Sequence, residues 1–146
     1  MAGLHLFAYG SILTGTGQRS LARTLRELVE DLGPGYVRAR LYDLGDYPGA
    51  VPSTNPGDRV QGRLLRLRAP LSALSRLDRY ERYDPRAEAA SEFVRRPVEV
   101  ALPGRPGPVT AYVYYYNRPA RHRPRVLPAD WPAWLRRRRG AASPGA

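Results

Sequence analysis

Several segments of the chain show the apolar spacing that is typical of β-strands. Leu4 to Tyr9 is a short apolar run that ends at Gly10, and it predicts a buried first strand. Tyr36 to Tyr42 alternates apolar and basic residues, as a half-exposed strand does. Val60 to Leu67 is also strand-like, and Gly62 within it indicates a bulge or a close backbone approach.

Two further strand-like segments are separated by a turn. Phe93 to Leu102 and Val109 to Tyr116 are rich in β-branched and aromatic residues, and the sequence between them is Pro-Gly-Arg-Pro-Gly-Pro. A proline- and glycine-rich connection of this kind predicts an antiparallel hairpin.

Other segments have helical spacing or break regular structure. Gln18 to Leu32 places apolar residues at helical intervals, and the glycines and proline of 33–35 predict its end. Pro70 to Tyr80 predicts a short amphipathic helix with proline in its first turn. Asp130 to Leu135 is consistent with a last short helix. The segment from Asp43 to Gly57 holds six glycines and prolines, so we expect a loop there.

Together these elements define a fold class. The chain of 146 residues has about five or six strands and two main helices, with connections mostly too short for regular βαβ units. We therefore expect an α+β fold with a small, mixed, barrel-like twisted sheet. Residues 1–135 should form a single domain, and residues 136–146 are expected to be a basic, disordered tail.

Charge and composition narrow the possible functions. The net charge is +11, and all 24 basic residues are arginines. From Arg118 onward eight arginines face one acidic residue, so most of the basicity belongs to the C-terminal segment. Such a segment can bind phosphate backbones, although a solvated chain end is the favoured interpretation.

Residues with metal-binding or nucleophilic side chains are scarce. The chain has no cysteine and two histidines far apart in sequence, which argues against disulfides, thiolate chemistry, a histidine metal site and a serine–histidine–carboxylate triad. It also has neither an apolar run of membrane-spanning length nor a signal-like N-terminus. We therefore expect a cytoplasmic protein without a membrane partner.

The first segment with candidate chemistry is Tyr9-Gly10-Ser11-Ile12, at the end of the first strand. A glycine directly after a buried strand lets the chain turn sharply, so that successive backbone N–H groups can point at one carboxylate or oxyanion. The alternative is an ordinary strand end with no binding role.

The second segment surrounds Glu81, at the C-terminal end of the predicted helix. Tyr80 and Tyr83 flank this glutamate. Loss of hydration beside aromatic rings raises the pKa of a carboxyl group toward neutrality, which suits a general acid or base. The alternative is a surface glutamate paired with Arg79 or Arg82.

The third segment is the tyrosine-rich strand before Asn117. Alternation places Tyr112, Tyr114 and Tyr116 on one face and Val113 and Tyr115 on the other. Tyrosine hydroxyls can orient a polar ligand, or they can close the wet edge of a core.

In combination these segments resemble the gamma-glutamylcyclotransferase family, which includes gamma-glutamylamine cyclotransferases and AIG2-like proteins. Six segments match the family's motifs in order, over about residues 4 to 135. They are Tyr9–Ile12, Leu41–Val51, Val60–Leu64, Leu77–Glu81, the hairpin of Phe93–Arg96 with Ala111–Tyr114, and Asp130–Trp131. The sequence departs from the family pattern at Ile12 for leucine, at Arg82 for glycine after the glutamate, and at Ala129 for glycine.

The resemblance implies an activity of the lyase or acyl-transfer type. The α-amine of a gamma-glutamyl substrate attacks its own γ-carbonyl, 5-oxoproline forms, and an amine leaves. Glu81 would be the catalytic acid and base. Tyr9, Gly10, Ser11 and Ile12 would bind the substrate, together with Tyr116, and no metal or organic cofactor would be needed.

The resemblance does not choose the leaving amine, which could come from an amino acid, a lysine side chain, a polyamine or a carrier. A small gamma-glutamyl compound is the expected partner. Two rival hypotheses stay open. One is a non-catalytic small-molecule binding or regulatory module on the same fold. The other, less favoured, is nucleic-acid association through the arginines at 136–139.

Overall fold

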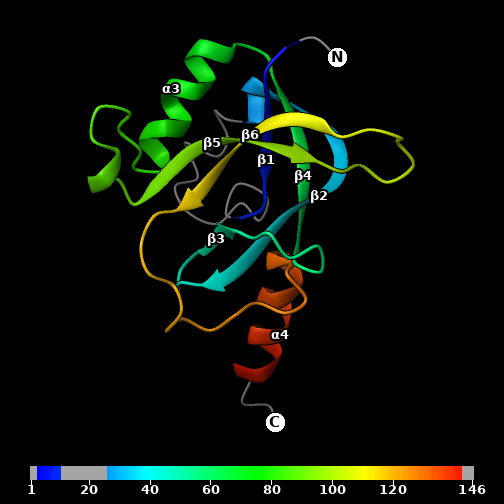
Figure 1. The fold of residues 1–146 in the computed structure, drawn as a ribbon, viewed down its shortest axis with the longest axis vertical. Coiled ribbons are helices and arrows are strands. Elements are labelled where there is room, and N and C mark those ends of the chain that lie inside the picture. Colours follow the sequence, from blue (N-terminus) through cyan, green and yellow to red (C-terminus); the bar gives the residue numbers. More distant parts are fainter. Residues whose placement is uncertain (1–2, 11–25, 143–146) are drawn as a thin grey trace.

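The computed structural model describes residues 3–10 and 26–142, and it places a curled β-sheet at the centre of the molecule (Figure 1). Helix α3 packs on one face of the sheet, and helix α4 lies at the opposite end of the molecule (Figure 1). The strands are β1 (His5–Ala8), β2 (Val29–Asp43), β3 (Pro48–Pro52), β4 (Arg59–Leu67), β5 (Phe93–Val100) and β6 (Val109–Tyr116). The helices are α3 (Pro70–Tyr80), the 3-10 helix η1 (Glu88–Ala90) and α4 (Trp131–Ala142).

The sheet has six strands in the order β3-β2-β4-β1-β6-β5. Strands β1 and β6 are parallel and pair Leu6 with Tyr112, whereas the other neighbours are antiparallel. The sheet curls strongly, since Tyr36 of β2 and Ala101 after β5 exchange backbone hydrogen bonds of 3.0 and 2.9 Å. At the other end, a Cβ added to Gly49 of β3 would lie 2.8 Å from Tyr116 Cβ of β6. The predicted α+β fold with a barrel-like sheet is thus confirmed.

Apolar residues are buried on both faces of the sheet. The apolar residues from Leu6 to Tyr9 are buried on both sides of the sheet, because Phe7 and Tyr9 face the inside of the curl while Leu6 and Ala8 face α3. Helix α3 covers the second face with Ala73, Leu74 and Leu77. Full burial of Leu77 stabilises this contact by about 2 kcal/mol.

Most of the predicted elements are confirmed. Helix α3 has the predicted bounds, and β5 and β6 form the predicted antiparallel hairpin. Strand β4 is also present, and Gly62 within it marks a close approach. A Cβ at Gly62 would lie 2.4 Å from the carbonyl oxygen of Ala8 and 2.6 Å from Phe7 Cζ, so only glycine fits.

The predicted helix from Gln18 to Leu32 is wrong at its C-terminal end. Residues 26–28 are helical, but β2 begins at Val29 and continues through the glycines and proline of 33–35. Pairing with β4 overrides the local signals, and a register shift between Asp31 and Gly33 accommodates the left-handed φ of 113° at Gly33. Residues 18–25 lie outside the described part of the chain.

The expected loop from Asp43 to Gly57 contains the short strand β3. This strand lies at an edge of the sheet, and Pro48 and Pro52 are its end residues. Proline has no N–H to donate, and an edge strand tolerates this because one of its sides has no partner strand.

The C-terminal tail is also different from the prediction. Helix α4 extends well past Leu135, so residues 136–142 are helical and not a disordered tail; residues 143–146 lie outside the described part. Asp130 caps the helix, because its Oδ1 accepts a hydrogen bond of 3.1 Å from the Ala133 N–H. None of the helices in residues 3–10 and 26–142 is long and apolar enough to cross a membrane.

Candidate active site

The end of helix α3 determines where Glu81 lies. Glu81 is the C-cap residue, and the chain leaves the helix through a paired hydrogen-bond motif. The Arg82 N–H donates to the Arg79 carbonyl at 3.2 Å, and the Tyr83 N–H donates to the Asp78 carbonyl at 2.8 Å. This Schellman-type ending fixes the backbone of Glu81 and requires a left-handed conformation at the next residue. Arg82 adopts it, with a φ of 55°.

Glu81 has an unusual electrostatic environment. Burial raises the pKa of its carboxyl group to about 8, and the negative charge of Glu92 adds to this effect. Among the described residues, neither Arg79 nor Arg82 forms an ion pair with Glu81. The structure therefore does not support the alternative of a paired surface glutamate. A carboxyl group with this pKa can both accept and return a proton near neutral pH.

Arg82 contacts the second carboxylate near the site. Its Nη1 lies 3.5 Å from Glu92 Oε2, and Tyr47 donates a hydrogen bond to Glu92 Oε1. Burial, followed by the bond to Glu92, raises the pKa of Tyr47 to about 12. Tyr47 lies in the loop after β2, Arg82 follows α3, and Glu92 directly precedes β5. The contacts of Glu92 therefore connect three separate parts of the fold near Glu81.

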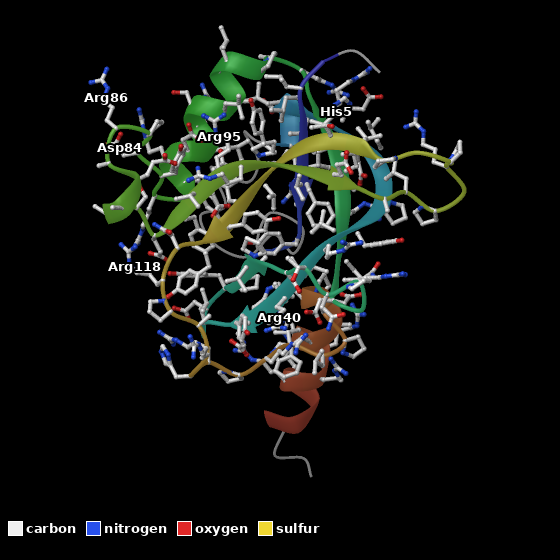
Figure 2. The ribbon with its side chains drawn as sticks, in the orientation of Figure 1. His5, Arg40, Asp84, Arg86, Arg95 and Arg118 are labelled. Atoms are coloured by element: carbon white, nitrogen blue, oxygen red, sulfur yellow. The ribbon has the colours of Figure 1, made fainter. Side chains whose placement is uncertain are left out.

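A half-buried network attaches α3 to the sheet one helical turn before Glu81. Arg95 of β5 donates to both carboxylate oxygens of Asp78, at 3.0 and 3.1 Å, and the Tyr114 hydroxyl donates to Asp78 Oδ1 at 2.5 Å. Figure 2 shows Arg95 on β5 beside α3. Sequence reasoning missed Asp78 and Arg95 as supporting residues. The available signal was an acidic residue one helical turn before Glu81.

Tyr9 lies near Glu81, but its hydroxyl group is already hydrogen-bonded within the protein. The hydroxyl donates to the Tyr114 carbonyl at 2.5 Å and accepts from the Ala50 N–H at 3.2 Å. Burial, and then the charge of Glu81, raise the pKa of Tyr9 far above its usual value. Tyr9 thus connects β1 with β3 and β6 at the edge of the candidate site.

The predicted backbone cradle is only partly within the described residues. Gly10 follows Tyr9 and lies against β3, where an added Cβ would be 3.0 Å from Pro48 Cγ. Ser11 and Ile12 lie outside the described residues, so the cradle stays a prediction.

Tyr116 ends β6 on the face that also carries Tyr112 and Tyr114, as alternation predicted. Its ring lies 5.5 Å from the Phe93 ring, and its hydroxyl makes no hydrogen bond within the described part of the chain. It is half-buried, and its charged form would raise the pKa of the neighbouring Tyr47. Tyr116 is therefore available as a polar contact near Glu92.

No group of three histidine, cysteine, aspartate or glutamate side chains within residues 3–10 and 26–142 is placed to hold a metal ion. Among the described residues, the charge of Glu81 acts on Tyr9 and Tyr114, and the charge of Glu92 acts on Glu81. Fold and site together define a small α+β protein with a glutamate of raised pKa where its curled sheet meets a helix end.

A known protein family matches this chain over most of its length. Residues 6–133 match the model of the family "Gamma-glutamyl cyclotransferase, AIG2-like", and the chain belongs to that family. The match begins in β1 and ends in the first turn of α4, so it includes every element that builds the site. No curated protein matches the chain.

Solved structures show the same fold. YkqA from Bacillus subtilis matches with a TM-score of 0.68 at 14% identity, over 95% of this chain and 43% of YkqA. The chain therefore spans less than half the length of YkqA. An uncharacterized protein from Pyrococcus horikoshii matches with a TM-score of 0.63 at 14% identity, over 97% and 100% of the two chains. An AIG2-like protein from Mus musculus matches with a TM-score of 0.58 at 19% identity, over 92% and 84%.

Proposed function

We propose that the protein is a gamma-glutamylcyclotransferase in which Glu81 transfers the proton. The observation that carries the proposal is the isolation of Glu81, a desolvated carboxyl group with a raised pKa and no ion-pair partner among the described residues. Membership in the family supports the reaction class.

The proposed reaction needs one group that takes a proton and then returns it. Glu81 removes a proton from the substrate's α-amine as that nitrogen attacks the γ-carbonyl carbon. The new C–N bond closes the five-membered ring, and the original C–N bond of the γ-amide breaks. Glu81 returns the proton to the departing nitrogen, so the products are 5-oxoproline and a free amine. Because the attack is intramolecular, the site mainly holds the substrate in its reactive shape.

Substrate contacts complete the proposal. Backbone N–H groups of the segment from Tyr9 to Ile12 bind the substrate's carboxylate or its developing oxyanion. The free hydroxyl of Tyr116 is a second polar contact. The Tyr9 side chain positions this segment, since its hydroxyl is engaged by β3 and β6.

The arginines of α4 are less available to a nucleic acid than the sequence suggested. Arg138 donates to Asp43 and to the Gly45 carbonyl, and Arg137 donates to the Leu127 carbonyl. Two arginines of that run, Arg136 and Arg139, have no hydrogen-bond or ion-pair partner within the described residues. Their double substitution by glutamine tests nucleic-acid binding without removing the helix.

The decisive experiment measures 5-oxoproline release from a panel of gamma-glutamyl amino acids, gamma-glutamyl-lysine and gamma-glutamyl polyamines. We expect release from at least one of these classes and a loss of about 1,000-fold or more in Glu81→Gln. Glu99→Gln is the matched control, because Glu99 is exposed on β5 and should leave the rate unchanged. Full activity in Glu81→Gln would refute the mechanism. Binding of a gamma-glutamyl compound without turnover would favour the non-catalytic module.

A further inference from the structure

A cavity lies away from Glu81, between residues 3–5 and the β5–β6 hairpin. Its volume is about 610 Å³, and it is lined by residues 3–5, Pro97 and residues 105–112. Strands β1 and β6 pair at Leu6 and Tyr112, and the cavity lies on the N-terminal side of that pair. Tyr9 and Tyr116 lie at the C-terminal ends of the same two strands, so this cavity is separate from the proposed active site.

The lining combines apolar walls with basic and polar side chains. Leu4, Val109, Ala111 and three prolines form the walls, whereas His5, Arg105, Thr110 and Tyr112 supply polar atoms. No carboxylate is present among the described lining residues. A cavity with this composition suits a ligand that has an apolar body and a negatively charged end.

His5 is the buried polar group of this cavity. Its side chain is 4% exposed, and its Nε2 has no hydrogen-bond partner within the described part of the chain. A buried polar atom without a partner costs free energy, and a ligand atom that reaches this imidazole would relieve that cost. Figure 2 shows His5 beside the first part of β6.

The electrostatic field at His5 is positive. Burial lowers the pKa of its imidazole, and the positive charges of Arg66 and Arg105 lower it further. The charge of Arg66 is balanced by Glu30, with which it forms an ion pair. Within the described residues, the positive charge of Arg105 is not paired in this way, and it favours an anion beside His5.

Arg105 provides a cation on a stiff loop. Its side chain is exposed and has no partner among the described residues, in contrast to Arg95 and Arg138. The prolines at 103, 106 and 108 restrict the loop, and its turn is closed by a 3.1 Å hydrogen bond from the Arg105 N–H to the Leu102 carbonyl. A loop that is already ordered loses less conformational entropy when its arginine binds a ligand.

We infer that this cavity is a second ligand site, which binds a small organic anion with a carboxylate or phosphate end and an apolar body. Arg105 contacts the anionic end, and the imidazole of His5 forms a hydrogen bond with it. The prolines and Leu4 enclose the apolar body. No bond is made or broken at this site.

The test is an NMR titration of the full chain with benzoate and with phenyl phosphate, followed at the two histidine side chains. We expect saturable shifts at His5 with at least one of the two anions, and not with neutral benzamide. Bound benzoate should raise the titration midpoint of His5 by about one pH unit, because it supplies a nearby negative charge. His122 is exposed and serves as the internal reference.

Matched variants show whether the cavity is responsible. Arg105→Gln should weaken anion binding about tenfold, whereas Arg86→Gln should leave it unchanged. Both arginines are exposed, and Figure 2 shows Arg86 at the left edge of the molecule, well away from His5. Equal weakening in the two variants, equal shifts at the two histidines, or the absence of saturable shifts with both anions would overturn the inference. Preference for benzoate or for phenyl phosphate would identify the anionic group.

Discussion

At the scale of single residues, the function depends on how Glu81 differs from the other acidic residues. The other carboxylates near the end of α3 have partners, since Asp78 pairs with Arg95 and Glu92 contacts Tyr47 and Arg82. Glu81 is desolvated without such compensation. Its ionised form is therefore disfavoured in the folded protein, and folding must supply the free energy that holds it there.

This environment predicts a specific dependence of stability on pH. The pKa of Glu81 rises from 4.5 in the unfolded reference to about 8 in the folded protein. Between these values the folded state holds a proton that the unfolded state has lost. The contribution of Glu81 is thus fully present below pH 4.5 and is lost as pH rises toward 8.

We expect Glu81→Gln to become more stable than the wild type as pH increases over this window, by up to roughly 1.4 kcal/mol for each pH unit. Urea unfolding of both proteins at pH 5, 6.5 and 8 measures the difference, in which all other titrating groups cancel. Glu99→Gln should show no such trend, since Glu99 is exposed on β5. A constant difference between Glu81→Gln and wild type would show that Glu81 is ionised throughout.

At the scale of elements, the end of α3 explains the departure at Arg82. Glycine is the usual residue where a helix ends in a left-handed conformation, because it has no Cβ to clash. Arg82 occupies that position with a φ of 55°. The Arg82 side chain forms an ion pair with Glu92. Because that side chain is 78% exposed, the ion pair contributes little to stability.

Arg82→Gly is therefore expected to stabilise the protein by about 0.5 to 1 kcal/mol, because it relieves the backbone strain. Loss of the weak ion pair and the greater freedom of glycine in the unfolded chain oppose this gain, but they are smaller. Arg79→Gly provides the control within the same helix and should destabilise the protein by about 1 kcal/mol. Thermal or urea unfolding distinguishes the two. Destabilisation by both substitutions would mean that the contact with Glu92 matters more than the strain.

At the scale of the whole molecule, α4 is attached to the sheet through Asp43. This carboxylate is 11% exposed at the end of β2 and accepts hydrogen bonds from Trp134 Nε1 at 2.8 Å and from Arg138 Nη1 at 3.1 Å. Trp131 anchors the start of the helix and is fully buried. The basic C-terminal segment is thus part of the folded domain, at least through residue 142.

Asp43→Ala should destabilise the protein by about 2 kcal/mol and loosen α4, because it leaves Trp134 and Arg138 without their shared acceptor. Hydrogen exchange of the amides in α4 should become faster, while exchange in α3 stays nearly unchanged. Asp46→Ala is the control, since Asp46 is exposed in the following turn. Unchanged exchange in α4 would mean that Trp131 and the other contacts of the helix hold it without Asp43.

Local patterns in the sequence determined the elements whose partners lie next to them. The bounds of α3 and the β5–β6 hairpin followed from helical spacing, strand spacing and turn residues. The motif around Glu81 was also readable, because its flanking tyrosines and its place at a helix end are local features.

Only the tertiary structure decided features that depend on residues far apart in the chain. Val29 to Gly35 is a strand because β4 pairs with it, and α4 extends past Leu135 where Asp43 receives Arg138. The state of Glu81 belongs to the same group. Its sequence neighbours Arg79 and Arg82 offered charges to pair with, yet the fold half-buries Glu81 and directs Arg82 toward Glu92. Burial and pairing are set by contacts across the sheet, and local sequence does not encode which distant residue arrives there.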